Sequence, residues 1–144
     1  MSYTLVVILH LFCAIVFLGF VFADLFVLPV MKKVLAEPEY QKVMNAISGR
    51  ARMIFPLSVL TLILSGGFMF TKYINSELGI FNSSLQLLLI LKAFLALVIA
   101  SGIIYSLICK LLKKTPHPMM KHFHKFVLVT GILIIALAKF MFIV

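Results

Sequence analysis

The sequence predicts an all-α integral membrane protein whose four helices cross the bilayer as an up-and-down bundle. Of its 144 residues, 64% are hydrophobic and only 12% are charged, which is more apolar than a water-soluble domain of this size requires. Four apolar segments are long enough to cross about 30 Å of hydrocarbon, which takes roughly 20 helical residues. The expected helices, within a single domain over residues 1–144, are residues 3–31, 53–73, 85–109 and 124–144.

The first helix has an apolar core at residues 3–23. This core lacks the basic start and the small-residue cleavage site of a signal peptide, so we expect it to be retained. The sequence stays apolar from Leu25 to Met31, with Pro29 near the end of this stretch. We therefore expect the helix to continue past Asp24 and to stop before Lys32 and Lys33.

A short helix is expected in the first loop. Pro38 suits the first turn of a helix, and apolar residues recur at helical spacing from Tyr40 to Ile47. This helix could run on into the second span. Pro56 falls in the first turns of that span, where a proline bends a helix unless the helix is only beginning.

The other two loops contain turn-forming residues. In the outer loop, residues 74–84, the segment 82–84 offers N-terminal caps for the third helix. The third loop, residues 113–118, contains Pro116 and Pro118 and so cannot be helical throughout. Short connections of this kind predict antiparallel neighbours.

The net charge of +9 could indicate nucleic-acid binding, but the basic residues gather in two loops instead of forming a groove-reading surface. In and beside the first and third loops the basic residues are Lys32, Lys33, Lys42, Arg50 and Arg52, and Lys110, Lys113, Lys114, Lys121 and Lys125. The outer loop contains a single charge, Glu77. The positive-inside rule therefore predicts that both basic loops are cytoplasmic and that both termini face outward. We expect no nucleic acid to be bound, because the distribution of charge is explained by membrane topology.

Three ionisable residues lie inside the predicted spans. Such groups cost roughly a few kcal/mol or more, so His10, Lys92 and Lys139 are candidates for a functional site. Counted from the outer ends of the spans, His10 and Lys92 lie about 10 Å deep and Lys139 about 8 Å deep. Gly66 and Gly67 reach the same level and would let a flat ligand or a neighbouring backbone approach. We expect these residues to share one site.

Simpler interpretations remain open for these residues. Lys139 lies five positions from the carboxyl terminus and could extend outward along its own stem to the membrane surface. His10 could be a structural histidine that is hydrogen-bonded to a neighbouring helix. Its spacing from Phe17 and Asp24 nevertheless predicts that all three face the bundle interior. In the second span, a polar stripe is expected at Ser58, Thr61, Ser65 and Lys72.

A second group of candidate ligands lies in and before the third loop. Histidine, methionine and thiol side chains suit copper. The residues of this group are Cys109, Met119, Met120, His122 and His124. The alternative is a plain basic loop that binds anionic lipid headgroups.

Several short motifs support a comparison with known membrane enzymes. They are a histidine in the first span, residues 52–56 (RMIFP), 65–67 (SGG) and 91–92 (LK), and, more loosely, 134–140 (IIALAKF). With these motifs the chain resembles the HemJ-type protoporphyrinogen oxidases. The resemblance covers all four helices and implies a haem b protein in which His10 and Lys92 are functional, Lys92 being the candidate catalytic residue. It also implies oxidation of protoporphyrinogen IX, with electrons passing to quinone.

Haem fits the candidate residues because an imidazole binds the iron, cations bind the two propionates, and the flat macrocycle fits between helices. We expect His10 as the axial ligand and Lys92 and Lys139 as the propionate partners. His124 cannot be the second ligand, because it lies about 22 Å from the level of His10. Met69 or Lys92 could fill the sixth position, or it is open.

The first span also resembles another family. His10, Gly19 and residues 26–29 (FVLP) are similar to the CopD-type copper-resistance membrane proteins, which implies copper transport or resistance. A noncatalytic membrane assembly subunit is the third possibility. The expected location is a bacterial inner membrane, the expected partners are the lipid bilayer and a porphyrin or quinone, and a homo-oligomer is left open.

Overall fold

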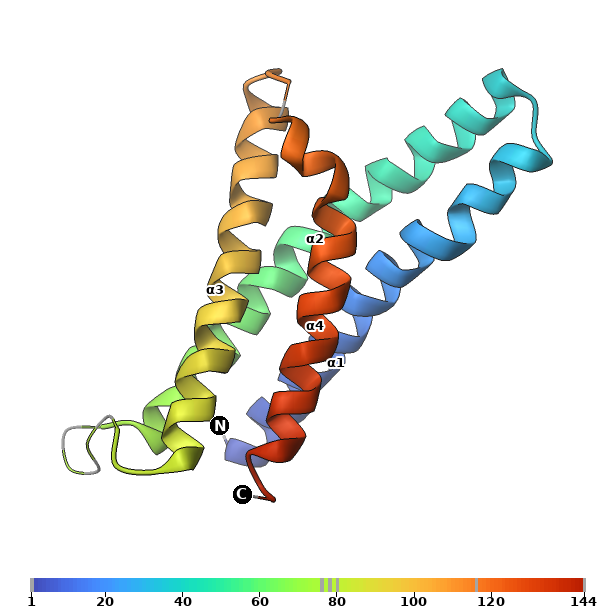
Figure 1. Cartoon of the computed structure of the whole chain (residues 1–144). Helices are drawn as coiled ribbons and strands as arrows, with labels where there is room; N and C mark the ends of the chain where they lie inside the picture. The colour runs from blue at the N-terminus through green and yellow to red at the C-terminus, as the bar shows by residue number, and fades with distance from the viewer. Residues whose placement is uncertain (1, 76, 78, 80, 116, 144) are drawn as a thin grey trace. The chain divides into compact units, whose positions relative to one another are not determined.

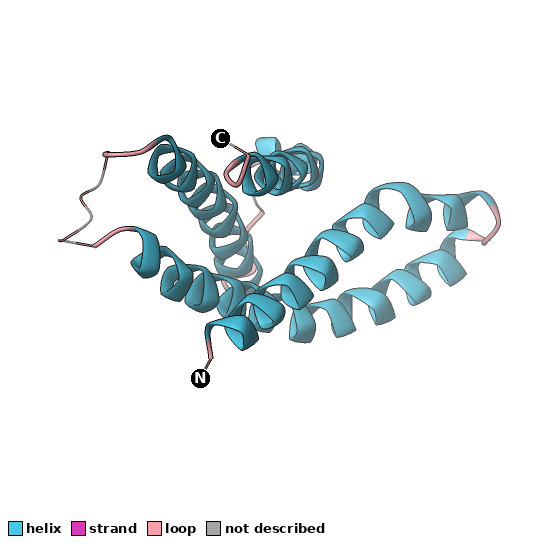
Figure 2. Cartoon of the chain, turned by 90° about the horizontal axis from the view of Figure 1, so that it is seen from below, coloured by secondary structure: helices cyan, strands magenta, loops and turns pink. Residues whose placement is uncertain are grey.

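Helices account for nearly all of the chain (Figures 1 and 2). The computed structural model describes residues 2–75, 77, 79, 81–115 and 117–143. The long helices are α1 (Tyr3–Phe22), α2 (Glu37–Tyr73), α3 (Ser84–Leu111) and α4 (Phe123–Phe140), and the shorter turns are η1 (Ala23–Val27), η2 (Leu28–Lys33) and η3 (Pro118–His122). Over these described ranges there is no strand, and four helical segments are long and apolar enough to cross a membrane. The predicted all-α, four-helix membrane class is confirmed.

The chain divides into two compact units, Met1–Ser65 and Gly66–Val144. The division falls inside α2, which is one continuous helix. The single domain predicted over residues 1–144 stays a prediction, and the predicted end of the fourth span at Val144, like Pro116 in the third loop, lies outside the described residues.

In the first unit, α1 begins at an N-cap formed by Ser2, whose Oγ accepts a hydrogen bond from the Leu5 amide. The α-helical pattern ends at Phe22, but the helical path continues through the π-turn η1 and the 3-10 turn η2. Pro29 explains this change, because it lacks an N–H and its ring clashes with the carbonyl one turn earlier. The helix therefore passes Asp24 as predicted and ends at Lys33, slightly later than predicted.

The second helix is much longer than a membrane crossing requires. It starts at Glu37 with Pro38 in its first turn and continues for 37 residues, about 55 Å. The short helix predicted in the first loop therefore runs on into the second span. Pro56 lies in the middle of α2 and not in its first turns. Within the first unit, α1 and the first part of α2 run side by side in opposite directions (Figure 1).

In the second unit, Ser83 is the N-cap of α3, and its Oγ accepts a hydrogen bond from the Gln86 amide at 3.3 Å. The cap predicted in residues 82–84 is confirmed. After the third loop, η3 leads directly into α4, which returns antiparallel to α3 (Figures 1 and 2). A side chain added at Gly102 would collide with the ring of Phe123, so the backbone of α3 lies directly against that ring.

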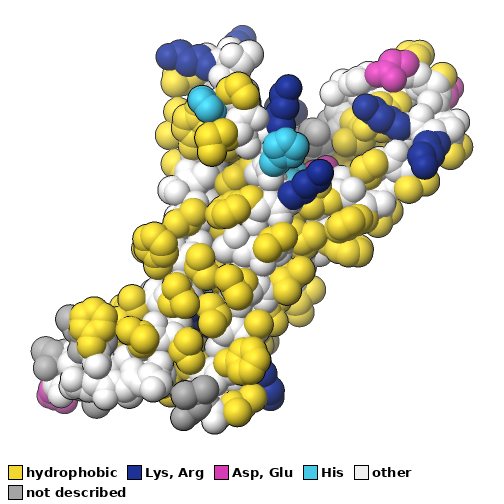
Figure 3. Space-filling model, viewed as in Figure 1, with side chains coloured by type: hydrophobic (Ala, Val, Ile, Leu, Met, Phe, Trp, Pro, Cys, Tyr) yellow, Lys and Arg dark blue, Asp and Glu magenta, His cyan; other side chains and the backbone are white. Residues whose placement is uncertain are grey.

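Large apolar side chains cover the outer faces of the helices. Ile15 on α1 is 71% exposed, Leu64 on α2 65% and Val129 on α4 67%. Figure 3 shows such side chains along the length of the helices, with Lys and Arg gathered toward the loop ends of the hairpins. Surfaces this apolar are stable in hydrocarbon and not in water. The chain is an integral membrane protein whose outer surface contacts the lipid bilayer.

Candidate functional site

His10 lies on the buried face of α1. The buried residues of this helix follow one stripe, Val6, Cys13, Phe17 and Val21, and His10 falls between Val6 and Cys13 on the same stripe. The side chain of His10 is itself half-buried. The predicted inward-facing stripe is confirmed for His10 and Phe17, whereas Asp24, which is half-buried, follows α1 in the π-turn η1.

A hydrogen bond links His10 to the second helix. Its Nδ1 lies 2.8 Å from Oγ of Ser65, a buried residue of α2. The same Oγ lies 2.6 Å from the carbonyl oxygen of Thr61, one turn earlier in α2. A serine hydroxyl has a single hydrogen, and here that hydrogen is donated to Thr61. With its hydrogen on Thr61, Ser65 Oγ accepts from Nδ1–H of His10, and in the neutral tautomer that makes this bond the lone pair is on Nε2.

This arrangement is common among metal-binding histidines. Histidines that bind a metal through one ring nitrogen usually donate the other N–H to an oxygen, which holds the ring in one tautomer and one orientation. Ser65 does this for His10 from a different helix. The same bond also agrees with the simpler interpretation of His10 as a residue that links two helices.

The polar stripe predicted on α2 is present, but its members have different surroundings. Ser58 and Ser65 are buried, whereas Lys72 is exposed. Thr61 is half-buried and donates its hydroxyl to the Leu57 carbonyl of its own helix at 2.8 Å. Ser65 is thus the member of this stripe that reaches α1.

The other α2 candidates follow Ser65 and belong to the second unit. A Cβ added at Gly67 would meet no atom within 4 Å, so the space beside this glycine is open. Gly66 and Met69 are both half-buried. Because these residues and His10 fall in separate units, their proposed meeting at one haem stays a prediction.

The two intramembrane lysines lie on neighbouring helices of the second unit. Lys92 is half-buried on α3, and Lys139 is exposed in the last turn of α4. Neither helix contains an acidic residue that could neutralise them. Counting from the contact of Gly102 with Phe123 places Lys92 level with Leu133, about 9 Å along the axis from Lys139.

The candidate copper ligands differ in their burial. Cys109 is buried near the end of α3, whereas Met119, His122 and His124 are exposed and Met120 is half-buried. In the part of the chain that the structure describes, no three His, Cys, Asp or Glu side chains are grouped so as to hold a metal ion.

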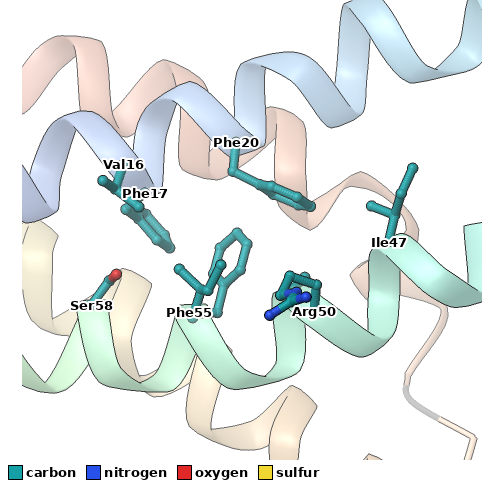
Figure 4. Close-up of a pocket in the computed structure, with 9 residues that line it drawn as sticks. Val16, Phe17, Phe20, Ile47, Arg50, Phe55 and Ser58 are labelled. Atoms are coloured by element: carbon teal, nitrogen blue, oxygen red, sulfur yellow. The ribbon is translucent and has the colours of Figure 1, made fainter.

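An apolar groove separates α1 from α2 in the first unit (Figure 4). It has a volume of about 440 Å³. The ring of Phe55 on α2 lies edge-on to two rings of α1, with centroid distances of 5.4 Å to Phe17 and 4.7 Å to Phe20. Arg50 lines the groove toward one end and Ser58 toward the other. Sequence reasoning did not identify this groove, because it depends on how the rings pack.

Sequence reasoning also missed Gln86, which is only 6% exposed at the start of α3. Its Nε2 donates to the carbonyl oxygens of Tyr73 and Gly79, at 3.1 and 3.2 Å, and its Oε1 accepts from the Asn82 amide at 2.9 Å. One side chain thus holds both ends of the outer loop. The spacing of Ser83 and Gln86 matches a capping box, the sequence signal that could have found it.

The fold and these sites define the class of the protein as a four-helix integral membrane protein with a hydrogen-bonded histidine in its first helix. Comparison of the chain with protein-family models, with curated proteins and with solved structures finds no match. Function therefore has to be argued from the residues themselves.

Proposed function

We propose that the chain is a membrane redox protein that binds haem b through His10. The observation that carries this proposal is the hydrogen bond between His10 Nδ1 and Ser65 Oγ. It orients the imidazole and leaves its lone pair on Nε2, the nitrogen that would bind the iron. When bound, haem supplies one-electron redox chemistry.

The remaining candidates have supporting roles in this proposal. Lys92 and Lys139 would neutralise the two propionates, since α3 and α4 contain no carboxylate that competes for them. Gly66 and Gly67 would admit the flat macrocycle, and Met69 is the proposed sixth ligand.

We further propose, by analogy with the HemJ-type enzymes, that the protein oxidises protoporphyrinogen IX and that quinone accepts the electrons. In this reaction Lys92 would hold a substrate carboxylate instead of a haem propionate and would act as the catalytic residue. Lys92→Met should then reduce oxidation of the porphyrinogen while leaving bound haem in place. Loss of haem in this variant would instead assign Lys92 to the cofactor.

The test of haem binding is an absorption spectrum. Protein purified in mild detergent from haem-producing cells should show a Soret band and one iron per chain. His10→Ala should abolish the band, whereas the matched variant His124→Ala, which changes an exposed histidine, should keep it. A colourless preparation with normal helix content by circular dichroism contradicts the proposal.

The same purified sample separates the alternatives. Copper that survives dialysis and is lost in the His122→Ala, His124→Ala double variant would support a CopD-like copper transport or resistance protein. Absence of both iron and copper would support a noncatalytic assembly subunit.

The proposal includes an orientation in a bacterial inner membrane, with both basic loops cytoplasmic and both termini outside. Single cysteines introduced at Ser2 and at Lys113, both exposed, report on it once the two native cysteines are replaced by serine. A membrane-impermeant maleimide should label intact cells at position 2 but not at position 113. The reverse pattern contradicts the orientation.

A further inference from the structure

The groove between α1 and α2 is suited to hydrocarbon. Its volume of 440 Å³ would hold about fifteen water molecules. Its walls include Phe17, Phe20, Ile54 and Phe55, whose side chains offer no hydrogen bonds to water. Water in such a space loses more than it gains, so an apolar occupant is favoured.

A cation lies toward one end of this apolar space. Arg50 lines the groove, and its side chain is exposed (Figure 4). Between residues 24 and 52 the chain has five basic and three acidic residues, so this end of the unit is positive. Of the three acidic residues, Glu37 and Glu39 lie at least about 16 Å from Arg50 along the axis of α2. Asp24 lies closer to this end, in η1 and one turn beyond Phe20, and with it counted five basic against three acidic residues still leave a net charge of +2. The charge therefore favours an anion at this end.

The groove also lies where the chain changes from polar to apolar. The apolar stretch of α2 begins directly after Arg52, so Arg50 belongs to the interface and Ser58 to the hydrocarbon region. The two residues are separated by about 12 Å along α2. An occupant must therefore be anionic at the membrane surface and apolar further in.

From these observations we infer that the groove binds one acyl chain of an anionic phospholipid, with the lipid phosphate on Arg50. An arginine is suited to this role because its guanidinium forms paired hydrogen bonds to phosphate oxygens. His10 does not line the groove, so this lipid site stands apart from the proposed haem site and its test is independent of haem.

The chain has no tryptophan, so a single introduced tryptophan reports on the groove without background. Phe55→Trp protein is reconstituted in phosphatidylcholine vesicles that contain a minor fraction of either dibrominated phosphatidylglycerol or dibrominated phosphatidylcholine. Bromine quenches tryptophan on contact. We expect the anionic lipid to be enriched about fivefold at the groove, because the attraction between one Lys or Arg and anionic lipid headgroups corresponds to a preference of this size. Brominated phosphatidylglycerol should therefore quench more strongly.

Three further variants test whether the selectivity comes from Arg50 and from the groove. Arg50→Gln should bring the two lipids to equal quenching, whereas Arg52→Gln removes the same charge from a residue that does not line the groove and should keep the difference. Arg52 instead donates its Nε to the Ser48 carbonyl oxygen at 3.3 Å. A tryptophan at Leu57, which is 67% exposed, should be quenched equally by both lipids.

Equal quenching of Phe55→Trp by both lipids overturns the inference. So does an equal loss of selectivity in Arg50→Gln and Arg52→Gln, because it would indicate general surface charge instead of a site. If Phe55→Trp fails to fold, Phe20→Trp on the opposite wall provides the same measurement with the same criteria.

Discussion

The two units of the chain hold their helices together in different ways. In the second unit the backbone of α3 at Gly102 lies against the ring of Phe123. In the first unit the described contacts between α1 and α2 are made by side chains: rings pack edge-on around Phe55, and His10 forms a hydrogen bond with Ser65. In the second unit the absence of a side chain at Gly102 allows α3 to approach α4 closely. In the first unit the phenylalanine rings keep the backbones of α1 and α2 further apart.

This difference has a physical origin and a consequence for function. Lipid tails are as apolar as the helix surfaces, so helices in a membrane associate through close packing and hydrogen bonds and not through the hydrophobic effect. Glycine allows the close approach in α3, whereas the phenylalanines of the first unit leave a groove of about 440 Å³. We therefore expect the first unit to host an apolar ligand and the α3–α4 hairpin to be the more tightly packed of the two pairs of helices.

The largest expected effect is on the packed hairpin. Gly102→Leu should lower the free energy of unfolding by about 3 kcal/mol, because the new side chain collides with the ring of Phe123 and forces the helices apart. Denaturation with sodium dodecyl sulfate in mixed micelles, followed by circular dichroism, measures this change.

The matched control is Gly19→Leu on α1, where an added Cβ meets no atom within 4 Å. This change should be neutral or slightly stabilising, by up to about 1 kcal/mol, since leucine has the higher helix propensity. The double variant Gly102→Leu, Phe123→Ala removes the ring and should recover part of the lost free energy of unfolding. Equal effects at Gly102 and Gly19 would remove the contrast between the units.

A smaller effect is expected where the second unit anchors its outer loop. Gln86→Leu removes three hydrogen bonds and leaves the Asn82 amide and the Tyr73 and Gly79 carbonyls without this side-chain partner. We expect a loss of about 2 kcal/mol, concentrated in the loop, because each of the three lost hydrogen bonds contributes roughly 0.5–1.5 kcal/mol. Hydrogen exchange at the Asn82 amide should therefore become at least about tenfold faster.

Gln41→Leu is the control for this change. Gln41 is exposed on α2, and its Nε2 donates to Glu37 at 3.1 Å on the helix surface. Its loss should cost only a few tenths of a kcal/mol. If Gln86→Leu has no greater effect than Gln41→Leu, Gln86 does not anchor the loop.

The helices and their caps could be predicted from the sequence because they depend on local signals. Hydropathy marks the four spans, Ser83 marks the start of α3, and Pro29 marks where α-helical bonding fails. Proline does not determine how the chain continues, so the π-turn at Ala23–Val27 and the 3-10 turn that follows it could not be predicted.

The site could be predicted only in part, because helix spacing determines a face and not a partner. The spacing placed His10 on an inward face and Ser65 on a polar stripe, but their pairing depends on the rotation and axial position of one helix against the other. The groove at Arg50 could not be predicted, because its existence depends on the rotamers of the phenylalanine rings as well as on the pairing of the helices. Lys92 and Lys139 could be identified because a charge inside a span is costly wherever it lies.

The smallest expected effect tests the polar bond between the helices of the first unit. Ser65→Ala removes the acceptor of His10 Nδ1–H, and hydrogen bonds between membrane helices contribute about 0.6 kcal/mol on average and at most about 1.7 kcal/mol. We expect about 1 kcal/mol of destabilisation in the same unfolding assay. Thr61→Ala is the control, because its hydroxyl bonds only within α2 and should contribute less. A double-mutant cycle with His10→Ala isolates the bond: no coupling between positions 10 and 65 would mean that Ser65 does not orient the imidazole, which removes the basis for assigning Nε2 to a metal.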